Sequence, residues 1–213
     1  MNETPYHKQA DQKHNEKKGQ KKKPKKKQER TGPRPPKKIT QRYLYNSGLA
    51  YLQRFPASTH HFRRTMGNKI TRSCTHHIDQ DKEKCLELLE GVIEQFIELE
   101  LLNDEAYLRG MVTSLRRRGL SQSSIIAKLG QKGLAREEIT QAITEFDQRE
   151  YEYHEEEYSG ELHAAIKLAR KKRLGPYDIE QKKDYQKSLA TLARAGFSYD
   201  IASKALNLEV DDI

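Results

Sequence analysis

The chain has 213 residues, of which 34% are apolar and 33% are charged, and it carries a formal net charge of +9. No stretch approaches the ~18 uncharged apolar residues of a membrane-spanning helix, and no apolar segment of the secretory kind follows the basic N-terminus. Two cysteines are too few for a disulfide scaffold. The composition therefore favours a cytosolic protein, and the positive charge indicates a polyanionic partner.

The excess of positive charge lies at the N-terminal end. Residues 1–38 hold 14 Lys and Arg against 4 Asp and Glu, whereas the rest of the chain holds 26 against 27. Apolar residues are almost absent there, so burial cannot offset the backbone entropy cost of ordering, about 1–2 kcal/mol per residue. We predict a disordered Lys/Pro-rich arm over 1–38. Its central lysines either bind phosphates without sequence preference, aid solubility or form a nuclear signal, and the first is favoured for Lys21, Lys22, Lys23, Lys25, Lys26 and Lys27.

The remainder of the chain alternates in sign. Residues 39–72 carry six bases and no acids, and residues 73–108 carry ten acids and two bases. Residues 109–136 then carry seven bases and no acids, and residues 137–161 carry ten acids and one base. Two interpretations stay open: distinct basic and acidic faces, or neighbouring helices that neutralise one another.

The apolar pattern after residue 38 is helical. Apolar residues recur at i, i+3 and i+4 within 84–102, and Asn103 and Asp104 then form a polar break and a helix N-cap. Further apolar stripes cover 107–115, 125–129, 139–146, 162–169, 185–192 and 201–206, with N-caps expected at Ser121, Asp178 and Ser198. No window alternates with a period of two, so we expect no β-sheet.

Similar joints connect these helices. Gly119-Leu120-Ser121, Gly133-Leu134-Ala135 and Gly196-Phe197-Ser198 each combine a glycine free to adopt positive φ, an apolar residue and the start of a helix. The joints divide the chain into three-helix units at 39–102 (with a loop insertion at 71–82), at 103–150 and, after an acidic hinge at 151–161, at 162–213. We predict an all-α fold of about three tandem three-helix repeats.

Two sets of motifs follow one another at a defined separation in the second and third units. They are Leu101-Leu102-Asn103-Asp104-Glu105, Tyr107, Arg118-Gly119-Leu120-Ser121, Ile125, Leu129 and Lys132-Gly133-Leu134, then residues 168–176 (LARKKRLGP) and 192–199 (LARAGFSY). Their order and spacing resemble the RecX family of regulatory proteins over residues 45–207. The resemblance implies a curved, elongated solenoid that binds the RecA recombinase and its filament on single-stranded DNA, damping its ATPase and strand-exchange activities.

The chain departs from the family pattern in three places. The first unit keeps a cap and a basic helix at 58–64, but the family's Lys-Leu ending is blurred at 66–70. The insertion at 71–82 is unusual, and the lysine-rich arm lies outside the pattern, so the resemblance implies nothing about its role.

Three basic clusters are candidate contact sites. They are Arg116, Arg117 and Arg118 with Lys128 and Lys132; Arg170, Lys171, Lys172 and Arg173; and Arg63 with Arg64. A cation near a helix C-terminus gains ~0.3–1 kcal/mol from the helix dipole, so the residues alone favour solvated helix ends. With the resemblance, contact with DNA phosphates or with an acidic recombinase surface becomes the favoured interpretation.

Signals of metal or enzyme chemistry are missing from the sequence. The spacing of Cys74, His76, His77 and Cys85 matches no common zinc arrangement. The glycines do not form a phosphate-binding loop or a nucleophile elbow, and no HExxH motif occurs. We therefore expect no cofactor, no metal and no enzymatic activity.

The combined hypothesis is a non-enzymatic, monomeric modulator of RecA in DNA repair and recombination, which acts by occupying the filament and has no membrane partner. Its basic faces would contact DNA phosphates or acidic recombinase surface, and the acidic segments 79–105 and 145–161 would contact basic recombinase loops. The alternative is a helical nucleic-acid-binding protein that acts through its arm and basic faces without a recombinase. Deleting residues 1–38 discriminates between the two.

Overall fold

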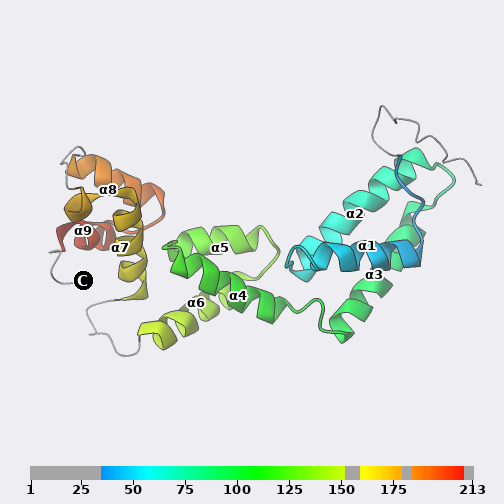
Figure 1. Ribbon diagram of the computed structural model, residues 1–213, viewed down its shortest axis with the longest axis horizontal. Helices are drawn as coiled ribbons and strands as arrows, with labels where there is room; N and C mark the ends of the chain where they lie inside the picture. The colour runs from blue at the N-terminus through cyan, green and yellow to red at the C-terminus, as the bar shows by residue number, and fades with distance from the viewer. Residues whose placement is uncertain (1–34, 152–158, 179–183, 209–213) are drawn as a thin grey trace, which may run out of the picture. The chain divides into compact units, whose positions relative to one another are not determined.

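The computed structural model describes residues 35–151, 159–178 and 184–208, and within these ranges it contains helices and no strand (Figure 1). The predicted arm lysines, Lys21 to Lys27, lie outside the described residues. The helices are α1 (Gln41–Leu52), α2 (Thr59–His76), α3 (Lys82–Glu98), α4 (Asp104–Arg117), α5 (Gln122–Gly130), α6 (Arg136–Tyr151), α7 (Gly160–Lys172), the 3₁₀ turn η1 (Gly175–Tyr177), α8 (Tyr185–Arg194) and α9 (Tyr199–Asn207).

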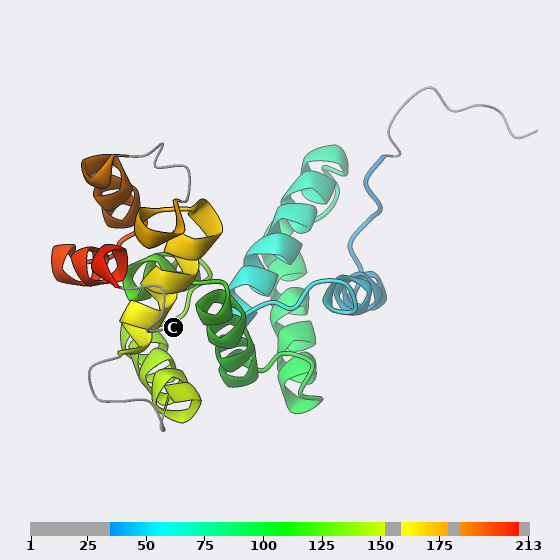
Figure 2. The ribbon, with the colours of Figure 1, turned by 60° about the vertical axis from the view of Figure 1, so that its left-hand side comes forward.

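The helices form three repeats, each with its own apolar core. One cluster of buried side chains joins α1, α2 and α3, a second joins α4, α5 and α6, and a third joins α7, α8 and α9. Figure 2 shows α7 packed beside α8 and α9 in the third repeat. The predicted all-α class of tandem three-helix repeats is therefore confirmed.

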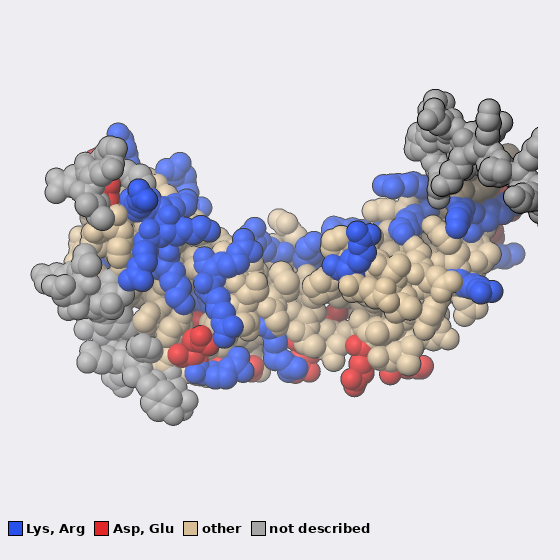
Figure 3. All heavy atoms as spheres, in the orientation of Figure 1, with Lys and Arg blue, Asp and Glu red and all other residues tan. Residues whose placement is uncertain are grey.

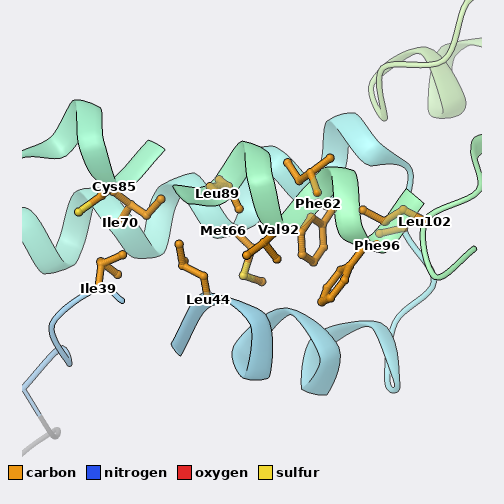
Figure 4. Close-up of a cluster of buried hydrophobic side chains, with 12 residues drawn as sticks. Ile39, Leu44, Phe62, Met66, Ile70, Cys85, Leu89, Val92, Phe96 and Leu102 are labelled. Carbon is orange, nitrogen blue, oxygen red and sulfur yellow. The ribbon is translucent and has the colours of Figure 1, made fainter. Parts of the chain in front are cut away.

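The first repeat packs around two phenylalanine rings. Phe62 of α2 and Phe96 of α3 are both fully buried, with their ring centroids 5.7 Å apart (Figure 4). Burial of such a side chain contributes about 1.5–3 kcal/mol. Gly48 lets α1 approach them, because a Cβ at this position would lie 2.8 Å from the Phe62 ring and 2.9 Å from the Phe96 ring.

Helix starts follow the predicted caps closely. Ser58, Asn103, Ser121 and Ser198 are N-caps, and the side-chain oxygen of each accepts a hydrogen bond from a backbone N–H in the first turn. The expected cap at Asp178 is wrong. Asp178 follows η1, and α8 begins after Asp184 instead.

The loop predicted at 71–82 is shorter than expected, because α2 continues to His76 and α3 begins at Lys82. Ser73 lies in the added part of α2, and its buried hydroxyl donates to the carbonyl oxygen of Lys37 at 2.8 Å. Lys38 also forms an ion pair with Asp79, and the His77 ring nitrogen lies 2.9 Å from the carbonyl oxygen of Pro36. The last residues of the predicted arm are therefore attached to the first repeat rather than disordered.

The predicted acidic hinge at 151–161 falls mostly on residues 152–158, which lie outside the described residues. On either side, α6 ends at Tyr151 and α7 begins after the N-cap Ser159. Among the described residues, no helix combines the length and the apolar character that crossing a membrane requires.

Candidate functional site

Consecutive repeats are joined by the same set of polar contacts. The Ser58 hydroxyl, before α2, donates to the Lys132 carbonyl oxygen after α5 at 2.5 Å. The Ser121 hydroxyl, before α5, donates in the same way to the Ala195 carbonyl oxygen after α8 at 2.6 Å. The N-terminal end of a repeat's second helix therefore meets the C-terminal end of the next repeat's second helix.

An acidic residue of the following repeat completes each joint. The Asp104 carboxylate accepts the backbone N–H of Thr59 at 2.6 Å, and the Glu161 carboxylate accepts that of Gln122 at 3.1 Å. Both carboxylates lie at the positive end of a helix dipole, where negative charge is stabilising. The joints place the basic residues of neighbouring repeats next to one another.

Arg116 was predicted as a surface contact, and the structure contradicts this. Its side chain is 2% exposed and forms ion pairs with Asp147 at 2.5 Å and Glu161 at 2.6 Å. Burial would lower the pKa of the guanidinium, but the hydrogen bonds and charges of Asp147 and Glu161 outweigh burial and raise it. Arg116 therefore holds α4, α6 and α7 together, because it follows the buried Val112 by four residues and so lies on the same face of α4.

The two arginines that follow it remain on the surface. Arg117 is exposed and lies 3.7 Å from Glu150. Arg118, which caps α4, is also exposed, as is Lys128 on α5. These three side chains are accessible to a polyanion.

Lys132 and Arg64 meet at the first joint. Their side-chain nitrogens lie 3.4 Å and 3.2 Å from the two ring nitrogens of His61. Burial first, and then the charges of Lys132, Arg64 and His60, lower the pKa of His61. The sequence had placed Arg64 and Lys132 in separate clusters, and folding brings them to one imidazole.

Arg63 is engaged by an acid of its own repeat. Its guanidinium binds the Glu90 carboxylate on α3 through two nitrogens, at 2.8 and 2.9 Å. The hydrogen bond that Arg63 donates to Glu90 raises the pKa of Arg63, against a smaller opposing effect of burial. This pairing reduces the positive charge that Arg63 offers to an external anion.

The cluster at the end of α7 is exposed throughout. Arg170, Lys171, Lys172 and the C-cap Arg173 are all solvent-accessible. The Arg170 guanidinium lies 5.3 Å from the centre of the Tyr177 ring, within the range of a cation–π contact. Figure 3 shows Lys and Arg gathered over α7 and over the neighbouring end of α4.

Lys167 adds to this basic surface, and the sequence analysis missed it. The residue is exposed on α7, and a Cβ on Gly119 would lie only 3.1 Å from its Cβ. The close approach of Gly119 therefore places the end of α4, with Arg118, beside α7. A single lysine within an apolar helix pattern gives no signal of this neighbour.

The charge alternation corresponds both to neighbouring helices that neutralise one another and to a distinct acidic side. Bases on α2 and α4 form ion pairs with acids on α3 and α6, as Arg63 does with Glu90. A pocket of about 260 Å³ between α4 and α6 is bordered by the acids Asp104, Glu105, Glu138 and Glu145 and by one base, Arg109. The third helices are thus acidic in the first two repeats, and this side disfavours phosphates.

The cysteines and neighbouring histidines belong to the first repeat. Cys85 is buried in its core, Cys74 packs against that core, and the His76 and His77 rings lie edge to face 4.7 Å apart. Burial raises the pKa of the Cys85 thiol. The described part of the chain holds no group of three or more acidic, Cys or His side chains arranged to bind a metal ion.

Comparison with known proteins gives consistent relatives, although no protein-family model matches the chain. It is 35% identical over 179 residues to the regulatory protein RecX of Myxococcus xanthus, covering 83% of this chain and 90% of that one. It is 32% identical over 116 residues to RecX of Agrobacterium fabrum, covering 54% and 56%. Among solved structures, RecX from Lactobacillus salivarius superposes with a TM-score of 0.53 at 20% identity, covering 81% of this chain and 97% of that one. Another RecX crystal structure gives 0.52 at 20% identity, covering 79% and 72%.

Proposed function

Because the chain belongs to the RecX family of regulatory proteins, we propose that it regulates a RecA-type recombinase by binding the recombinase filament on single-stranded DNA. Regulation follows from occupancy rather than from chemistry. The bound protein lowers the DNA-stimulated ATPase and strand-exchange activities of the filament.

The observation that carries the proposal is the exposed basic surface formed where two repeats meet. Arg118 of the second repeat follows α4 next to Gly119, which lies against Lys167 on α7, the helix that ends in the cations Arg170 to Arg173. Phosphates attract such a surface through Coulomb forces and counterion release, and this term makes binding strongly dependent on salt. Arg116 contributes by orienting α4, α6 and α7 rather than by touching the partner.

The acidic third helices support a contact of the opposite sign. Glu94 on α3 and Glu138 and Glu145 on α6 are exposed and offer carboxylates to basic loops of the recombinase. Several weak contacts distributed along a repeat protein give avidity without a deep pocket. A filament that presents both DNA phosphate and protein fits a surface with both signs of charge.

The decisive experiment measures the effect of the purified chain on the single-stranded-DNA-stimulated ATPase of a RecA-type recombinase. We expect inhibition when this chain is present at up to one copy per recombinase subunit. The double substitution Lys171→Glu and Lys172→Glu is expected to weaken this inhibition. Arg149→Glu, on the acidic helix α6, is the matched charge control and leaves inhibition unchanged. Absence of both inhibition and filament binding at physiological salt contradicts the proposal.

A truncation separates this function from plain nucleic-acid binding. Because Lys37 and Lys38 contact the first repeat, the cut belongs before residue 35 rather than after residue 38. Retained inhibition after removal of residues 1–34 assigns the regulation to the repeats. Binding to DNA alone, with no effect on the recombinase, favours the nucleic-acid-binding alternative instead.

A further inference from the structure

The two joints between repeats share one backbone arrangement. At the first joint the Ser58 hydroxyl bonds to the Lys132 carbonyl oxygen, and at the second joint the Ser121 hydroxyl bonds to that of Ala195. A shift of 63 residues carries both partners of the first joint onto those of the second. The side chains at equivalent positions of the two joints can therefore be compared directly.

Neutral hydrogen bonds close the second joint. The hydroxyls of Ser123 and Ser124 donate to the carbonyl oxygens of Gly196 and Ala195, each at 2.8 Å. Both side chains thus find acceptors in the backbone of the third repeat. Neither of them brings a charge to the joint.

Imidazoles and a cation occupy the equivalent positions at the first joint. His60 and His61 take the places of the two serines, and Lys132 takes the place of Ala195. A Cβ on Gly133 would collide with the His60 ring, so this ring lies directly against the second repeat. The first joint therefore carries positive charge where the second carries none.

Hydrogen-bond donors outnumber acceptors around His61. The Lys132 ammonium lies 3.4 Å from the Nε2 atom of the ring, and an Arg64 guanidinium nitrogen lies 3.2 Å from Nδ1. A neutral imidazole has one N–H and one acceptor nitrogen, so it can accept from only one of these two cations. The other cation faces an N–H, and the ring gives it no acceptor.

The acid of this joint does not supply the missing acceptor. Asp104 accepts the backbone N–H of Thr59 at 2.6 Å. Burial first, and then the charges of the two cations and of His60, lower the pKa of His61, with no opposing effect of a carboxylate. In the described part of the chain, neither of the two cations forms an ion pair with an acid.

We infer that the first joint binds a phosphate-type dianion and that His61 takes up a proton when the anion binds. Arg64 is exposed and Lys132 is half-buried, and they belong to different repeats, so an anion held by both links the repeats. A protonated imidazole donates from both nitrogens and adds a third positive charge. Three positive charges favour a doubly charged oxyanion over a carboxylate or a DNA phosphodiester, which carry one charge each. This site is separate from the basic surface of α7 and goes beyond the proposed function.

The test uses the full chain and sulfate, a tetrahedral dianion that does not titrate near neutral pH. Binding is followed by the backbone amide NMR signals of His61 and Gly133, with chloride at equal ionic strength as the salt control. Because the protonated ring binds the anion better, affinity rises as the pH falls. We expect about three- to tenfold tighter binding when the pH is lowered from about 7.5 to about 5.5.

Variants assign the site to its residues. Lys132→Gln and Arg64→Gln are each expected to weaken sulfate binding about three- to tenfold. Lys132→Gln leaves the joint itself intact, because Ser58 bonds to the backbone of this residue. His61→Gln is expected to bind sulfate equally at both pH values. Arg72→Gln, which removes an exposed cation about 12 Å further along α2, is the matched control and leaves binding unchanged.

Two results overturn the inference. One is sulfate binding that does not depend on pH, and the other is binding that is unchanged in both Lys132→Gln and Arg64→Gln. Titration of the His61 ring by NMR in the wild type needs no variant and therefore does not depend on how the variants fold. Its pKa is expected to rise when sulfate is added, and an unchanged pKa also overturns the inference.

Competition against sulfate identifies the source of the anion. Displacement by inorganic phosphate alone assigns the site to free phosphate. Displacement by oligothymidine with a 5′-phosphate, but not by the same strand with a 5′-hydroxyl, assigns it to a strand end. Equal displacement by the two strands overturns the dianion assignment, because backbone phosphodiesters then fill the site. These assays contain no recombinase, so a negative result leaves the proposed function intact.

Discussion

The Ser58 hydroxyl donates a hydrogen bond to the carbonyl oxygen of Lys132, 74 residues further along the chain. Ser121 and Ala195 form the same bond with the same separation of 74 residues. Each serine also accepts a backbone N–H of its own helix, so one hydroxyl caps a helix and binds the next repeat. Asp184 takes the corresponding N-cap position of α8, where an ionised carboxylate has no proton to donate.

Replacing the second of these serines is expected to weaken the joint between the second and third repeats. Ser121→Ala removes a fully buried hydroxyl and leaves the N–H of Ser124 without its cap. The expected loss is about 1–2 kcal/mol in the free energy of unfolding, measured by urea denaturation. Ser123→Ala serves as the control, because this exposed hydroxyl contacts the Gly196 carbonyl and the Ser121 hydroxyl but caps no helix. Equal losses in the two variants contradict the dual role of Ser121.

Arg116 is expected to behave as a structural residue and Arg118 as a surface residue. Arg116→Met leaves Asp147 and Glu161 without their cation, and each carboxylate is only about one-fifth exposed. We expect a loss of about 2–4 kcal/mol in unfolding free energy, the lower end reflecting partial solvent access. Arg118→Met changes stability by less than about 0.5 kcal/mol. An Arg116 variant of normal stability that no longer binds the filament contradicts this assignment.

The fold was largely predictable because its signals are local. Apolar residues at helical spacing, serine caps and glycines at helix ends all act within a few residues of the positions that they determine. The 71–82 loop, by contrast, involves contacts between distant parts of the chain. The last turns of α2 include Ser73, whose hydroxyl binds Lys37, 36 residues away.

The candidate site was harder to predict because neighbouring arginines have different surroundings. Arg116, Arg117 and Arg118 are adjacent in sequence, but the helix directs the first into the interface of three helices and the others outward. Lys167 gave no signal, since its neighbour Gly119 is 48 residues earlier in the chain. Charge runs therefore gave the candidate clusters, while the exposure and pairing of each side chain depended on contacts between repeats.

His61 is expected to make the first joint sensitive to acid. Burial and the nearby cations lower its pKa in the folded protein below the ordinary value of 6.5, so the unfolded chain binds this proton more readily. The stabilising contribution is therefore complete above about pH 6.5 and decreases as the pH falls toward the folded pKa.

The measurement compares urea denaturation of the wild type and of His61→Gln between pH 7.5 and 5.5. The wild type is expected to lose more stability over this interval than the variant. His76→Gln, at the other end of α2, is the control and retains the wild-type dependence on pH. Identical pH profiles for the wild type and His61→Gln would show that protonation of this ring is not coupled to folding.

Two glycine substitutions are expected to have opposite effects. Gly196 has φ of 91°, and a Cβ there would lie 2.2 Å from the Ser123 hydroxyl oxygen. Gly196→Ala therefore strains the backbone and displaces Ser123, and we expect a loss of about 1–3 kcal/mol in unfolding free energy.

Gly110 lies within α4 with nothing within 4 Å of the Cβ position, so Gly110→Ala should stabilise the protein by about 0.5–1 kcal/mol. The two sites share no contact, so the double variant should give the sum of the two effects in the same urea titrations. An unchanged unfolding free energy for Gly196→Ala would mean that the second and third repeats can lie further apart at this joint than the structure shows.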